Sequence, residues 1–113
     1  MENWEFDFEW LQIRHTIKDA MNQQELPTMN TILFLVGIQE CGVMKDEYSK
    51  EEKQDLMHIA VCSLLSEDGY YEFQGRDDDG WPHFKQLQAI DIHGVKEQGR
   101  LLQVRIIQYF KER

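Results

Sequence analysis

Apolar residues in the first part of the chain recur at the spacing of a helix. A helix over residues 4–21 would place five of them on one face, because they lie three or four positions apart: Phe6, Trp10, Ile13, Ile17 and Met21. Trp4, Phe8 and Leu11 would widen that face into an aromatic stripe. The alternation in WEFDFEW, residues 4–10, also fits a strand, so the first turns stay open between the two structures.

A second helix is expected over residues 28–41. Pro27 and Thr28 form a start signal, a nearly unbroken apolar run follows, and Gly42 is a stop signal. The run is short enough that a buried strand is the alternative.

The third helix, over residues 49–66, has the clearest start. Ser49 and Glu52 match a capping box, in which each side chain bonds a backbone N–H that the helix leaves unpaired, and Gly69 suits a left-handed cap past the end. Mostly apolar residues line two adjacent faces of it: Leu56, Ile59, Ala60, Ser63 and Leu64 on one, and Met57, Val61 and Leu65 on the other.

Between residues 67 and 93 the helical pattern stops. YYEF is strand-like, GRDDDG is turn-like and Pro82 cannot lie inside a helix, so this segment is either a short hairpin or a long ordered loop. A last helix is expected from Ile92 or Gly94 to Lys111. Its inward residues would be Leu101, Leu102, Ile106, Tyr109 and Phe110.

The pattern as a whole predicts an all-α or mostly α fold. Residues 1–113 would form a single domain of four helices packed in an antiparallel fashion, with a long aromatic and acidic loop or small hairpin between the third and fourth. The chain has 113 residues, and its apolar content of 42% suits one core.

Charge and composition limit the kinds of partner that are expected for the protein. The net charge of −9 argues against binding to nucleic acid. The acids of residues 2–9 and the bases of residues 94–113 could pack side by side. MENWEFDFEW lacks the features of a signal peptide, and the longest apolar run, residues 32–38, is too short for a membrane span. Cys41 and Cys62 fall within apolar helical patterns, so a soluble, cytoplasmic protein with reduced thiols and no membrane partner is expected.

The segment GRDDDG suggests a calcium loop, but the match fails. With Asp77, Asp79 and Gly80 aligned to positions three, five and six, Gly75 stands where the first ligand belongs and Gln86 replaces the bidentate glutamate. The alternative is an acidic turn in which an aspartate bonds the backbone and Gly80 takes a positive φ.

Asp55 and His58 lie one turn apart, as in half of a carboxylate-bridged di-iron site. With His83 they are the residues of one functional hypothesis, a metal- or small-ligand-binding helical protein, to which Glu40 is a further candidate ligand. The full di-iron pattern is absent because the pair does not repeat. A thiol nucleophile at Cys62, served by His58, has only its helical spacing in its favour. No cofactor is expected, and an enzyme is the less favoured class.

Nine of the thirteen aromatic residues fall in NWEFDFEW, GYYEF and GWPHF, and these segments are expected to meet. They would form either the edge of the core or an exposed patch for a protein partner or a second copy in a homodimer. The leading functional hypothesis is therefore a non-enzymatic interaction or adaptor domain that could also self-associate. The residues expected at the contact are Trp4, Trp10, Tyr70, Tyr71, Trp81 and Phe84.

At SKEEKQDLMHIAVCSLLSEDGYYEF and DDDGWPHF, which contain the blocks EEKQDLMHIA and DGWPHF, the chain resembles a family of short uncharacterised bacterial proteins. The resemblance spans roughly residues 26–110. It implies no activity, cofactor or catalytic residue.

Overall fold

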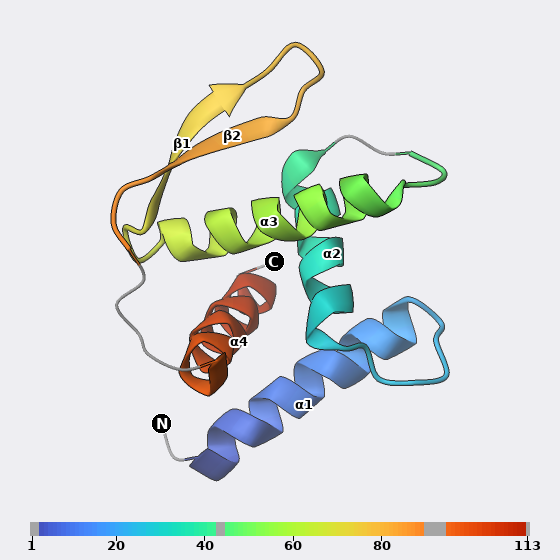
Figure 1. The fold of residues 1–113 in the computed structure, drawn as a ribbon. Coiled ribbons are helices and arrows are strands. Elements are labelled where there is room, and N and C mark those ends of the chain that lie inside the picture. Colours follow the sequence, from blue (N-terminus) through green and yellow to red (C-terminus); the bar gives the residue numbers. More distant parts are fainter. Residues whose placement is uncertain (1–2, 43–44, 90–94, 113) are drawn as a thin grey trace.

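The computed structural model describes residues 3–42, 45–89 and 95–112 (Figure 1). Within them the elements follow in the order α1 (Asn3–Ala20), α2 (Met29–Cys41), α3 (Lys50–Ser66), β1 (Tyr71–Arg76), β2 (Pro82–Gln86) and α4 (Val95–Lys111). The mostly α prediction is confirmed, whereas a purely helical domain is not, because a strand pair lies between α3 and α4. The expected start of the last helix at Ile92 or Gly94 lies outside the described residues.

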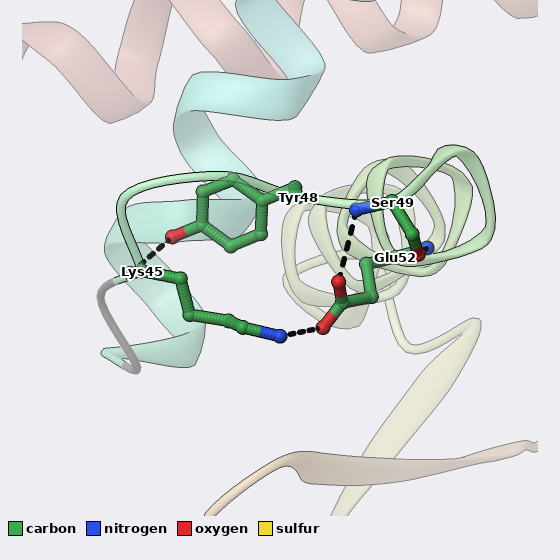
Figure 2. Close-up of polar contacts among 4 residues, drawn as sticks. All are labelled: Lys45, Tyr48, Ser49 and Glu52. Atoms are coloured by element: carbon green, nitrogen blue, oxygen red, sulfur yellow. Dashed lines mark hydrogen bonds and ion pairs between the residues drawn. The ribbon is translucent and has the colours of Figure 1, made fainter.

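Local signals set the starts of α2 and α3. The Thr28 hydroxyl accepts a hydrogen bond from the Thr31 N–H at 3.2 Å. The Ser49 hydroxyl accepts from the Glu52 N–H at 3.1 Å, and the Glu52 carboxylate accepts from the Ser49 N–H at 2.9 Å (Figure 2). Both predicted caps are therefore confirmed, the second as a complete capping box.

The end of α3 turns the chain into the first strand. Gly69 has a φ of 80°, its N–H bonds the Ser66 carbonyl at 3.0 Å, and the Tyr70 N–H bonds the Leu65 carbonyl at 3.2 Å. These two bonds form a Schellman motif with glycine in the left-handed position, as the sequence predicts.

The core forms where α2 crosses α3. Gly37 lies at this crossing, and a Cβ atom there would be 2.0 Å from the Leu56 carbonyl oxygen, so only glycine allows the two backbones to come so close. Because α2 crosses α3 instead of running alongside it, the predicted antiparallel arrangement of the helices is wrong (Figure 1). The main cluster of buried residues draws on all four helices: Ile17, Ile32, Leu33, Val36, Ala60, Leu64 and Ile106.

The segment after α3 is a hairpin that packs against α3. Strands β1 and β2 are antiparallel, with Phe73 opposite Phe84, and a bulge between Phe73 and Gly75 shifts the register. Trp81 and Phe84 pack against a second buried cluster of Cys41, Leu56 and Ile59. Of the two structures open for this segment, the hairpin is confirmed.

Helix α1 packs against α4, as the opposite charges of the two ends predict. The Lys111 ammonium lies 3.1 Å from the Glu9 carboxylate, and the Arg100 guanidinium lies 4.1 Å from the centre of the Phe6 ring. Among the described helices, none is long and apolar enough to cross a membrane.

Candidate functional site

The acidic turn between the strands is held by Asp77. Its Oδ1 accepts hydrogen bonds from the backbone N–H groups of Asp79 at 2.9 Å and Trp81 at 3.0 Å. The Gly80 N–H bonds the Asp77 carbonyl at 3.0 Å, and Gly80 has a φ of 87°. The expectation that an aspartate bonds the backbone here and Gly80 takes a positive φ is confirmed.

The second oxygen of the same carboxylate meets a histidine. His83 Nε2 lies 2.9 Å from Asp77 Oδ2. The hydrogen bond from His83, followed by those from the backbone N–H groups of Trp81 and Asp79, lowers the pKa of Asp77 because all of them favour the ionised carboxylate. Both side chains are exposed to solvent, so the pair lies at the surface of the hairpin.

An open cleft of about 490 Å³ lies between α3 and this turn. Asp55 and His58 line it from α3 and His83 lines it from β2, so the three residues of the metal or small-ligand hypothesis share one cleft. The remaining lining residues are Glu52, Ile59, Asp77, Asp79, Trp81 and Pro82. Even so, no three His, Cys, Asp or Glu side chains in the described part of the chain form a group that could hold a metal ion.

Glu52 lines the cleft and is held by contacts with Lys45 and Ser49, which do not line it. Glu52 lies between Lys45, whose ammonium contacts its Oε2, and the Ser49 N–H on its Oε1 (Figure 2). The hydrogen bond from Lys45, then that from Ser49, lowers the pKa of Glu52. Tyr48 holds the segment before α3 in place. Its hydroxyl accepts a hydrogen bond from the Lys45 N–H at 3.1 Å, and its ring packs edge-on against Phe34. This carboxylate therefore has a structural role at the start of α3.

Arg76, which sequence reasoning missed, ties the hairpin to the end of α2. Its guanidinium donates to the carbonyls of Cys41 at 2.5 Å, Gly80 at 2.8 Å and Glu40 at 2.9 Å. A cation at a helix C-terminus satisfies carbonyls that the helix leaves unpaired and interacts favourably with the helix dipole. Two of the acceptors, Cys41 and Glu40, stand 35 and 36 positions away in sequence, so no local pattern could reveal them.

Glu40 does not line the cleft, contrary to its suggested role as a further ligand there. Its carboxylate accepts from the Ser63 hydroxyl at 2.7 Å and the Tyr109 hydroxyl at 3.0 Å, which links α2, α3 and α4. A small cavity of about 100 Å³ adjoins this link. Cys62 is 1% exposed, and burial raises the pKa of its thiol to about 11, which opposes the nucleophile hypothesis.

The six aromatic residues expected at a contact do not come together. Trp10 packs against the main core cluster, whereas Trp81 and Phe84 pack against the second. Tyr70 and Tyr71 are half-buried, and Trp4 is exposed. The expectation that the N-terminal and hairpin aromatics meet is wrong, since α1 and the hairpin lie on opposite sides of α3 (Figure 1).

Helix α1 has two distinct faces. The inner face carries Phe6 and Ile17, which are 4% and 6% exposed. Trp4, Phe8 and Leu11 are 68%, 56% and 42% exposed, and their spacing of four and three residues places them on one side. The prediction that these three widen the buried face is therefore wrong. We call Trp4, Phe8, Leu11 and the exposed His15 the outer face of α1; an open hollow of about 460 Å³ lies beside its C-terminal half.

Comparisons with known proteins leave the function to be argued from this geometry. The chain matches no protein-family model, no curated protein and no solved structure. The resemblance suggested by the blocks EEKQDLMHIA and DGWPHF stays a prediction.

Proposed function

We propose that this protein is a non-enzymatic interaction domain that binds a protein partner through the outer face of α1. The observation that carries the proposal is the exposure of Trp4, Phe8 and Leu11 in one row. Large apolar side chains gathered on one exposed face are typical of protein contact surfaces, and tryptophan is enriched among the residues that dominate binding energy.

These three side chains contribute little to the packing of the fold, because they are largely exposed. The inner face of α1 makes the contacts with the core, through Phe6, Ile17 and the half-buried Trp10 and Ile13. The acids Glu5 and Asp7 flank the apolar row, and the net charge of −9 favours a protein partner over nucleic acid. A second copy of the chain is one such partner, and the bacterial cytoplasm, where both free cysteines would stay reduced, is the proposed location.

The proposal is tested by placing a photo-crosslinking phenylalanine analogue at position 8 in cells that make the protein. We expect a protein adduct at this position. Phe73 is the matched control, because it is also an exposed phenylalanine, at 53%, but lies on the hairpin. Adducts at position 73 and not at position 8, or adducts at neither, would contradict the proposal.

A second candidate function, the binding of a metal ion or small ligand, is favoured by one observation: Asp55, His58 and His83 line the same cleft. Thermal unfolding with Zn²⁺ and Mn²⁺ added, together with elemental analysis of untagged protein, tests it. A rise in the unfolding temperature that His58→Ala and His83→Ala both abolish would support this function. An unchanged unfolding temperature and no stoichiometric metal would reject the hypothesis that this cleft binds a metal ion.

A further inference from the structure

The outer face of α1 has the spacing of a coiled-coil seam. Trp4, Phe8, Leu11 and His15 follow at intervals of four, three and four residues, which is the alternation of d and a positions in a heptad. All four are exposed. Phe6 and Ile13, which pack inward, fall at the f position of the same heptad, opposite the seam. The seam therefore belongs to a helix that is already anchored on its other side.

We infer that this seam packs against the seam of a second copy, with the two α1 helices antiparallel. This inference rests on the proposed function and specifies its partner. Pairing a with d positions places Phe8 opposite the partner's Leu11 and Trp4 opposite the partner's His15. A two-fold axis then repeats both contacts, so the same surface of each copy is used.

The charges beside the seam fit the antiparallel order. Asp7 and Arg14 both fall at the g position, and g positions of antiparallel helices flank each other, so Asp7 would face the partner's Arg14 twice in the dimer. The Arg14 side chain is held in position by a hydrogen bond, which its Nε donates to the Pro27 carbonyl at 2.9 Å.

The parallel order fits less well. It would pair Arg14 with the partner's Asp19, but Lys18, at the next d position after the seam, would then face the partner's Lys18. Like charges facing each other destabilise a helix pair. The antiparallel order avoids this contact, because it places the two Lys18 residues beyond opposite ends of the seam.

The dimer is expected to be weak. The seam covers only residues 4–15, which places the contact among interfaces below about 1,200 Å². Each copy also carries a net charge of −9, so the two copies repel each other at long range. Association should therefore be measured by sedimentation equilibrium over a wide range of protein concentration.

Disulfide trapping tests the order of the helices. We would mix a Phe8→Cys protein with a Leu11→Cys protein under mild oxidation. We expect the mixed 8-to-11 product to exceed both same-position products by at least tenfold. The native thiols Cys41 and Cys62 are each 1% exposed, so the wild-type protein serves as the uncrosslinked control. A dominant 8-to-8 product would overturn the antiparallel order.

Charge reversal tests the pairing of Asp7 with Arg14. Asp7→Arg replaces two attractive contacts by two repulsive ones, so the dimer dissociation constant should rise roughly tenfold. Glu47→Arg is the matched control, because it changes the net charge equally at an exposed position outside α1. An equal effect of both variants would show that Asp7 does not pair with the partner's Arg14.

The outcomes separate the inference from the proposed function. If the purified protein stays monomeric at every concentration while position 8 still crosslinks another protein in cells, the second-copy inference fails and the interaction domain stands. If the protein is monomeric and position 8 gives no adduct, both fail.

Discussion

The outer face of α1 and the cleft between α3 and the hairpin are both open surfaces, but they differ in how their side chains are used. In the cleft, Asp77 bonds His83 and two backbone N–H groups, and Glu52 bonds Lys45 and Ser49. On α1, Trp4, Phe8 and Leu11 are exposed while the opposite face packs into the core. Two carboxylates of the cleft, those of Asp77 and Glu52, thus have structural roles. The exposed apolar side chains on α1 are explained by our proposal that they bind a protein partner.

The largest expected effect separates the two faces of α1. Phe6→Ala should lower the free energy of unfolding by about 3 kcal/mol, because Phe6 is 4% exposed and its removal leaves a cavity. Phe8→Ala should change it by less than about 0.5 kcal/mol, because Phe8 is 56% exposed. Chemical denaturation of the two variants measures both values. Equal losses would show that the two faces are not distinct.

Gly37 lies where α2 crosses α3, against the backbone of Leu56. Gly37→Ala should cost about 2 kcal/mol of stability, because the new Cβ would meet the Leu56 carbonyl and the helices must move apart. Gly99→Ala is the matched control within α4, where nothing lies within 4 Å and alanine should stabilise the helix by up to about 1 kcal/mol. Thermal unfolding should therefore move in opposite directions for the two variants, and a shared direction would argue against the close crossing.

Removal of Arg76 should affect the cleft and spare α1. Arg76→Met should cost about 1.5 kcal/mol, because three carbonyl oxygens lose a charged donor. Hydrogen exchange should accelerate in β1 and β2 but not in α1. Lys85→Met, at an exposed position of β2, is the control and should change little. Faster exchange in α1 would contradict the independence of the two regions.

The smallest expected effect concerns pH in the cleft. The pKa of Asp77 is lowered in the folded protein, so its contribution to stability is present above the ordinary aspartate pKa and is lost as the pH falls through the folded value. Asp77→Asn should thus make the hairpin less stable than the wild type near neutral pH, with the difference beginning to shrink as the pH falls below about 4 and vanishing only below the lowered pKa of the folded protein. The Trp81 backbone amide signal in NMR spectra reports the change. The exposed neighbour Asp78 supplies the control Asp78→Asn, and the same pH dependence there would contradict the role of Asp77.

The sequence predicted the fold best where the signal is local. Ser49 and Glu52 stand three residues apart and form the cap that this spacing indicates, and Gly42 and Gly69 both take the left-handed conformation expected past a helix end. The order of the helices follows from such signals, whereas the choice between hairpin and loop for residues 67–93 stayed open. The packing of the helices does not follow from them, because the crossing at Gly37 depends on Leu56, which comes 19 positions later in the sequence.

The candidate surfaces were harder to predict for the same reason. In α1, apolar residues occupy positions 4, 6, 8, 10 and 11, so periodicity alone does not decide which side faces the core. That choice is made by the docking of α4, through Glu9 with Lys111 and Phe6 with Arg100. The cleft required the hairpin to fold back on α3, which brings His83 to the same cleft as Asp55 and His58 although no sequence pattern joins them.

The three tryptophans allow the central claim, that α1 binds a second copy of the chain through its outer face, to be tested in one experiment. Trp4 lies on that face, Trp10 is half-buried against the core, and Trp81 lines the cleft. We would follow the three indole N–H signals by NMR while the protein is concentrated. We expect the Trp4 signal to shift with concentration while the Trp81 signal stays in place. A shift of Trp81 with Trp4 unmoved, or three constant signals at every concentration, would contradict it.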